Sequence, residues 1–104
     1  MFKLRFLTGS RKGRRVAVRQ GRLRVGSDPA CEVCLEKDGL EPEHAVFEER
    51  NGAVYLQVAP GAPVSIGGRP VQGESVLDDG DRIALGRVRL QVMLGQVERK
   101  RRAH

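Results

Sequence analysis

Two cysteines and two histidines are the side chains whose types and spacing could do chemistry. Cys31 and Cys34 form a C-x-x-C pair, a pattern found in zinc sites and in redox-active thiol pairs. Zinc needs four ligands, and only His44 and the terminal His104 remain to complete such a site. A redox pair usually opens a helix, but CEVCL reads as a strand, on which residues three apart point to opposite faces. We therefore expect packing cysteines, with no metal and no cofactor.

Nucleophilic catalysis finds no better support in the sequence. His44 is the only internal imidazole, and no spacing pairs it with a nucleophile or an acid. The glycine-rich stretch SIGGRPVQG lacks the Lys-Ser/Thr of a phosphate loop, and no helix is expected after it. The serines fall in expected turns or at strand starts: Ser10, Ser27, Ser65 and Ser75. We expect no enzymatic activity.

Length and composition indicate one small domain. A chain of 104 residues can bury a core, and with 4% aromatic residues and no Trp that core must consist of Val, Leu, Ile and Ala. No run approaches the ~18 apolar residues of a membrane span, and no signal peptide is expected. Two cysteines make no disulfide framework, so a reducing, cytoplasmic setting is expected.

The charge is unevenly distributed along the chain. The net charge is +6, yet residues 1–24 hold nine cations and no acid, whereas residues 28–50 hold eight acids. Either segment could meet an oppositely charged surface, or the basic segment could simply be solvated. The candidate docking residues are Arg11, Lys12, Arg14 and Arg15 on the basic side, and Glu41 and Glu43 on the acidic side.

Short strands separated by glycine-containing turns predict an all-β fold. FKLRFLT alternates apolar and basic residues, Asn51-Gly52 is a strong hairpin signal between HAVFEER and AVYLQV, and Gly86 joins RIALG to RVRLQVML. No window shows helical periodicity. The spacing predicts an antiparallel sandwich or barrel over residues 1–95, followed by a basic tail or linker at 96–104.

The succession of motifs resembles the forkhead-associated (FHA) domain. Val25-Gly26 closes a strand before SDPACEVCL, His44-Ala45 opens the next strand, SIGGRPV stands where the family has a turn, and LDDGDRIALG matches the family's Leu-x-x-Gly-Asp-x-Ile-x-Leu-Gly segment. The resemblance covers residues 2–94. It implies an antiparallel β-sandwich of about eleven strands, with its recognition loops at one end.

Most FHA domains bind phosphothreonine, and the resemblance locates the positions of that pocket. This chain has Ser27 where the family has Arg, Glu41 where it has Ser, and Ala62, or a neighbour, where it has Asn. His44 and Gly26 match positions that brace the loops. The resemblance therefore implies a degenerate site.

A carboxylate at position 41 opposes phosphate binding. Phosphothreonine needs Arg and N–H donors, and an ionised Glu41 only accepts hydrogen bonds. A like-charge pair at about 4 Å costs roughly 4 kcal/mol at an effective dielectric constant near 20. Arg24, Lys37 or Arg69 could still reach in, so a phosphopeptide reader using a displaced cation is the alternative.

Within the FHA family, the chain resembles the cytoplasmic domain of the inner-membrane ring subunit of type III secretion systems. That resemblance implies a non-catalytic assembly domain that docks a protein, either another subunit or a second copy. It also implies a cytoplasmic location, tethered to the inner membrane only if a span follows residue 104. Nucleic-acid or anionic-lipid binding through the basic strands is a third class, and aromatics for base stacking are scarce.

Overall fold

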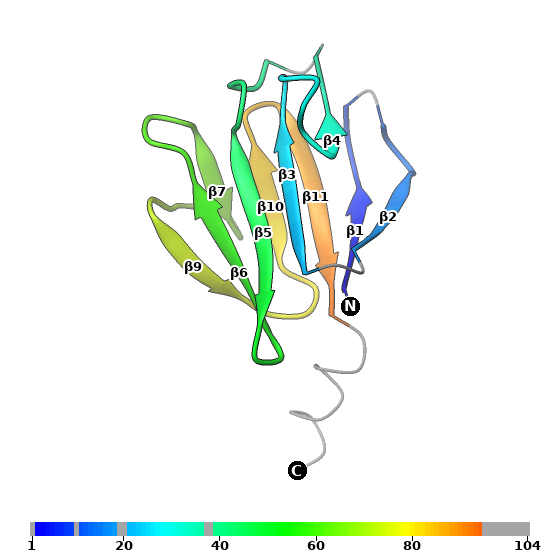
Figure 1. The fold of residues 1–104 in the computed structure, drawn as a ribbon, viewed down its shortest axis with the longest axis vertical. Coiled ribbons are helices and arrows are strands. Elements are labelled where there is room, and N and C mark those ends of the chain that lie inside the picture. Colours follow the sequence, from blue (N-terminus) through cyan, green and yellow to red (C-terminus); the bar gives the residue numbers. More distant parts are fainter. Residues whose placement is uncertain (1, 10, 19–20, 37–38, 95–104) are drawn as a thin grey trace.

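The computed structural model describes residues 2–9, 11–18, 21–36 and 39–94, which form two β-sheets packed face to face (Figure 1). The first sheet has the strand order β2-β1-β11-β10-β7-β8, and the second has the order β4-β3-β5-β6-β9. The eleven strands are β1 (Phe2–Phe6), β2 (Arg15–Val18), β3 (Arg22–Gly26), β4 (Val33–Cys34), β5 (Ala45–Arg50), β6 (Ala53–Val58), β7 (Val64–Ile66), β8 (Arg69–Pro70), β9 (Glu74–Leu77), β10 (Arg82–Leu85) and β11 (Val88–Met93). The predicted β-sandwich is confirmed.

Alternation of residue types sets which face of each strand is buried. In β1 the apolar residues Phe2, Leu4 and Phe6 are buried and the intervening Lys3 and Arg5 are exposed. Because successive side chains on a strand point to opposite faces, this pattern directs the basic residues outward. β11 and β10 repeat the pattern on either side of the turn at Gly86.

The predicted Asn51-Gly52 hairpin joins β5 and β6 in the second sheet. Both residues have positive φ, 51° for Asn51 and 81° for Gly52, as a two-residue hairpin turn requires. The six register pairs run from Arg50 opposite Ala53 to Ala45 opposite Val58. The turn chemistry therefore fixes the register of the longest hairpin.

The core lies between the two sheets. Most of it is aliphatic, but Phe2, Phe6 and Phe47 are also buried in it, so the prediction of a core of Val, Leu, Ile and Ala alone is wrong in this respect. The Phe2 and Phe47 rings join the sheets, with their centroids 6.4 Å apart. His44 is the one buried polar side chain among the described residues. No helix in the described ranges is long and apolar enough to cross a membrane.

The strand predicted over CEVCL is only partly correct. The Asp28 side chain accepts a hydrogen bond from the Ala30 N–H (2.9 Å), and the Cys31 N–H donates to the Asp28 carbonyl (2.9 Å). This turn delays the strand, so β4 contains only Val33–Cys34 and pairs with β3 in parallel. The sandwich is therefore not purely antiparallel. The tail predicted at 96–104 lies outside the described residues.

Candidate docking surface at the loop end

Several connections gather at one end of the sandwich. Figure 1 shows the β3–β4, β4–β5 and β6–β7 loops and the β10–β11 turn at the upper end of the molecule. The β1–β2 connection reaches the same end. The resemblance to FHA domains predicts the phosphate-pocket positions at this end.

The β3–β4 and β4–β5 loops are joined through their backbones. The Ser27 N–H donates to the Glu41 carbonyl and the Asp28 N–H to the Pro42 carbonyl, each at 3.0 Å. A Cβ atom on Gly26 would overlap the Pro42 carbonyl oxygen and would stand 2.8 Å from its carbon. Glycine at position 26 therefore leaves room for the close approach of the two loops, because it has no Cβ atom. The approach uses two backbone donors, the N–H groups of Ser27 and Asp28.

His44 connects the β4–β5 loop to the β6–β7 loop. Its ring is fully buried; Nδ1 accepts the Glu41 N–H at 3.0 Å, and Nε2 lies 2.9 Å from the Pro63 carbonyl oxygen. These partners require a proton on Nε2 and none on Nδ1, so the ring is the neutral Nε2–H tautomer. It supplies no positive charge to the loop end.

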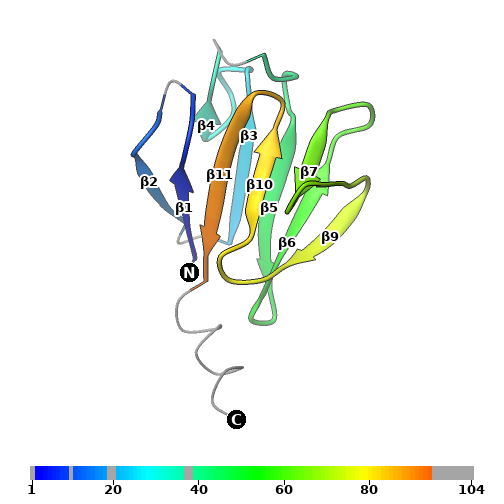
Figure 2. The same cartoon turned by 180° about the vertical axis from the view of Figure 1, so that it is seen from behind.

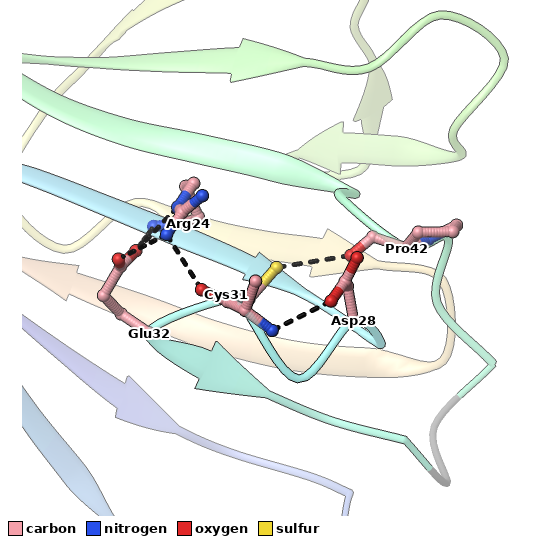
Figure 3. A network of polar contacts seen from close by, with 6 residues as sticks. Arg24, Asp28, Cys31, Glu32 and Pro42 are labelled. Carbon is pink, nitrogen blue, oxygen red and sulfur yellow. Dashed lines mark hydrogen bonds and ion pairs between the residues drawn. The ribbon is translucent and has the colours of Figure 1, made fainter.

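Arg24 forms a network with the β3–β4 loop (Figure 3). Its guanidinium donates to both carboxylate oxygens of Glu32, at 3.2 and 2.9 Å, and to the Ala30 carbonyl at 2.8 Å. The backbone N–H of Arg24 also donates to the Glu32 carboxylate, at 2.7 Å. These hydrogen bonds lower the pKa of Glu32 to about 2. Arg24 is therefore engaged with Glu32.

Both cysteines are free thiols in the same region. The Cys31 thiol is buried and lies 3.2 Å from the Pro42 carbonyl oxygen, and burial raises its pKa. The Cys34 thiol lies 3.5 Å from the Ser27 carbonyl oxygen. Cys31 precedes β4 and so does not share a strand with Cys34, contrary to the expectation from CEVCL. The described residues contain no group of three or more potential metal ligands.

The positions predicted to be degenerate lie on three loops, β3–β4, β4–β5 and β6–β7. Ser27 is half-buried and adjoins Glu41, which is exposed, whereas Ala62 is buried and its N–H donates to the Ala59 carbonyl at 3.0 Å. A shallow hollow of about 580 Å³ adjoins Ala62. Its lining residues come from the β6–β7 loop and the segment around β8, and none of them is charged. The hollow beside Ala62 thus presents no cation to an anion.

The cations proposed to substitute for the missing Arg lie elsewhere or are engaged. Arg69 follows a turn after β7. In that turn the Gly67 N–H donates to the carbonyl of Arg82, the first residue of β10, so Arg69 lies away from the loop end. Lys37 lies outside the described residues. Arg11, Lys12 and Arg14 belong to the β1–β2 connection and Arg15 begins β2; Glu41 and Glu43 are exposed on the β4–β5 loop.

Sequence reasoning missed one cation at this end, Arg87. A Cβ atom on Gly39 would stand 3.1 Å from the Arg87 guanidinium, so Arg87 of the β10–β11 turn lies against the β4–β5 loop. These residues are far apart in the sequence, and only strand pairing brings them together. No motif could have revealed the contact.

Comparison with known families shows what the chain is similar to. The family model described as the cytoplasmic domain of the inner membrane component of the type III secretion system (T3SS) matches residues 5–96. Comparison with curated protein sequences finds no match.

Solved structures show the same fold. The cytoplasmic domain of the T3SS sorting platform protein PscD from P. aeruginosa has a TM-score of 0.77 and 28% identity, over 91% of this chain and 81% of that chain. An FHA domain studied for phosphothreonine-dependent interactions has a TM-score of 0.77 and 26% identity, over 88% and 94%.

A third structure agrees on the fold alone. The FHA domain of CT664 from Chlamydia trachomatis has a TM-score of 0.80 and 23% identity, over 88% of this chain and 95% of that chain. A family model that spans residues 5–96 covers most of the chain. The chain therefore belongs to the family of the cytoplasmic domain of the T3SS inner-membrane component, and its fold is that of an FHA domain.

Proposed function

We propose that this domain is a non-catalytic protein-docking module that no longer binds phosphothreonine. The observation that carries the proposal is the set of backbone hydrogen bonds between the β3–β4 and β4–β5 loops. The Ser27 and Asp28 N–H groups, at and next to the position of the family's Arg, already donate to the Glu41 and Pro42 carbonyls. A phosphate would have to displace these bonds without the cation that stabilises it in the family.

Electrostatics at the loop end supports the same conclusion. Glu41 and Glu43 are exposed on the β4–β5 loop, and the His44 ring is neutral. A carboxylate about 4 Å from a phosphate costs between roughly 1 kcal/mol in bulk water and roughly 4 kcal/mol at an effective dielectric constant near 20, which is comparable to the roughly 1.5–3 kcal/mol that a charged hydrogen bond contributes. Arg24 offsets little of this electrostatic cost, because its guanidinium already donates hydrogen bonds to the Glu32 carboxylate.

The proposed role is assembly in the cytoplasm, with the domain tethered to the inner membrane in the full-length protein. Membership in a family of cytoplasmic domains of an inner-membrane component supports this placement. The proposed partner is another protein subunit or a second copy of the chain. The exposed β4–β5 loop and the basic β1–β2 connection would orient that partner through complementary charge.

A phosphopeptide reader with a displaced cation is the second candidate. The observation in its favour is Arg87, which lies against Gly39 of the β4–β5 loop. A phosphate held by Arg87 would sit nearer the β10–β11 turn than the family's pocket does. Exchanging Arg87 for Gln separates the two candidates, because only the second loses binding.

Restoring the family's residues tests the proposal. Isothermal titration with a phosphothreonine peptide and its unmodified twin should show no phosphate-dependent binding to the wild type. The double variant Ser27→Arg/Glu41→Ser should gain it, since a cation and a hydroxyl replace a neutral and an anionic group. Ser27→Arg/Glu43→Ser is the matched control, with the same net charge. Phosphate-dependent wild-type binding that Arg87→Gln abolishes would overturn the proposal in favour of the second candidate.

A further inference from the structure

The outer face of the first sheet carries a cluster of cations from four strands. Figure 2 shows this sheet in front, with β2, β1, β11 and β10 side by side. Arg15 pairs with Arg5, Arg5 pairs with Gln91, and Gln91 pairs with Arg82, which places three cations in one row across the sheet. Lys3 lies two residues before Arg5 on β1, and Arg89 lies two residues before Gln91 on β11, so both share the face of this row. The basic face is defined here as Lys3, Arg5, Arg15, Arg82 and Arg89, all exposed.

No acid neutralises the basic face within the described residues. None of its five side chains makes an ion pair there. The outer face of the second sheet is different, because Arg24 pairs with Glu32, and Arg50 pairs with both Glu48 and Glu74. The outer face of the second sheet thus holds cation–carboxylate pairs, whereas no side chain of the basic face forms one within the described residues.

Folding does not require this arrangement. Arg5 stands directly opposite Arg15 in the β1–β2 ladder, and like charges in that relation destabilise a sheet. The buried residues of β1 and β11 supply the packing, so the cations could be exchanged for neutral residues at no cost to the core. Strands spaced about 4.8 Å apart spread the row over roughly 14 Å. Neither core packing nor cross-strand pairing therefore accounts for the basic face.

The residues between the cations indicate what kind of surface fits. They are Ala17, Ser65, Ala84, Gln91 and Met93, which include no aromatic side chain. Tight protein interfaces rely on buried Trp, Tyr or Arg anchors, and this face carries neither Trp nor Tyr. Single strands of nucleic acid need stacking aromatics, and the major groove of a duplex admits a helix or a two-stranded ribbon rather than a broad sheet. Lipid headgroups need only charge.

We propose that the basic face rests on the headgroups of anionic phospholipids at a membrane surface. The family's description as part of an inner-membrane component places such a surface within reach of relatives of this domain. Contact through the first sheet leaves the second sheet and the exposed β4–β5 loop free for a protein partner. The inference does not depend on whether the loop end binds phosphate.

The expected affinity is modest and sensitive to salt. Each Lys or Arg close to an anionic leaflet adds about fivefold to the partition constant, and the gain falls off beyond a Debye length of about 8–10 Å. Loss of two cations from the basic face should therefore weaken binding about 25-fold. Such weak, reversible contact suits a domain that a tether keeps near the membrane.

Vesicle co-sedimentation with the full 104-residue chain tests the proposal. The probes are phosphatidylglycerol-containing vesicles and pure phosphatidylcholine vesicles, at low and high salt. The test variant is Arg5→Gln/Arg89→Gln. The control is Arg22→Gln/Arg69→Gln, which removes the same charge from exposed residues outside the basic face. Arg22 is on the second sheet. Arg69 pairs with Ile66, whose side chain packs on the core. Every variant keeps the basic tail, and equal melting temperatures establish that each is folded.

The wild type should bind only the anionic vesicles, the test variant should bind about 25-fold more weakly, and the control should change less than about threefold. Equal losses in the two variants would show that net charge or the tail carries the binding, and would overturn the proposal. Absence of any preference for anionic vesicles would do the same. If the wild type bound duplex DNA more tightly than vesicles and the test variant alone lost that binding, the basic face would be reassigned to nucleic acid. Self-association at low salt that the test variant alone abolishes would reassign the basic face to a second copy.

Discussion

A side chain on Gly26 would collide with the backbone of Pro42. The added Cβ atom would overlap the Pro42 carbonyl oxygen, and the Glu41 carbonyl oxygen would stand 2.9 Å away. Both obstacles are backbone atoms held by the hydrogen bonds of Ser27 and Asp28, so neither can move without breaking the joined loops. Gly26 therefore ends β3 where the backbone of the β4–β5 loop approaches it most tightly among the glycines described.

Replacing Gly26 with Ala should lower the free energy of unfolding by at least about 2 kcal/mol, because the new methyl group is overpacked against backbone. Urea denaturation measures this loss. Gly61→Ala is the control, since nothing lies within 4 Å of its Cβ position and only its φ of 80° opposes a side chain. That variant should lose about 1 kcal/mol. Equal losses would show that steric contact with Pro42 is not what holds the loops.

Substituting His44 with Phe should cost about 1–3 kcal/mol of stability, since it removes the hydrogen bonds of the ring to the part-buried Glu41 N–H and Pro63 carbonyl. His44→Asn keeps a polar atom near the position of Nδ1 and should recover part of the loss. Chemical denaturation of the two variants gives the comparison. If Phe proved as stable as the wild type, the ring would be packing alone and not joining the loops.

The ion pair of Arg24 and Glu32 predicts a dependence of stability on pH. Hydrogen bonds from Arg24 lower the pKa of Glu32 from 4.5 to about 2, so the folded state favours the ionised carboxylate. Its stabilisation is complete above pH 4.5 and is lost as the pH falls toward 2. Melting temperatures should show Glu32→Gln below the wild type near neutral pH, and the gap should close on acidification.

Glu36→Gln is the matched control for that experiment, because Glu36 is exposed and has no hydrogen bond or ion pair among the described residues. Its difference from the wild type should stay small across the same range. A gap for Glu32→Gln that persists at the acid end would mean that the contact does not depend on the charge of the carboxylate.

Changing Arg15 to Glu should raise the free energy of unfolding by about 0.5 kcal/mol, because an attractive cross-strand pair with Arg5 replaces a repulsive one. Arg15→Lys keeps the charge and should be neutral. The increase should shrink in high salt, which screens exposed charges. A loss of stability on introducing Glu would contradict the view that the basic face is retained at the expense of folding.

The sandwich could be predicted because each strand signals its own face and its own turn. The alternation of Phe2, Leu4 and Phe6, and the hairpin at Asn51 and Gly52, are local patterns. β4 was misjudged because the hydrogen bonds of Asp28 extend the preceding turn. Those bonds depend on side-chain orientation, which composition does not reveal.

The basic face and the contact of Arg87 with Gly39 could not be predicted, because both depend on strand order. β1 and β11 come from opposite ends of the described chain and pair directly. Only that pairing brings Arg82 and Arg89 beside the N-terminal cations. The positions predicted to be degenerate were taken from the resemblance to FHA domains, and the structure adds that Ser27 and Glu41 are neighbours through a backbone hydrogen bond.

The most direct measurement of the central claim is an NMR titration of the wild-type domain with a phosphothreonine peptide, followed at the amides of Ser27, Glu41 and Ala62. The account predicts the same small shifts with the phosphorylated peptide as with its unmodified twin, since the donors at this end are engaged within the domain. Saturable shifts at these amides that require the phosphate, with a dissociation constant below about 100 μM, would contradict it.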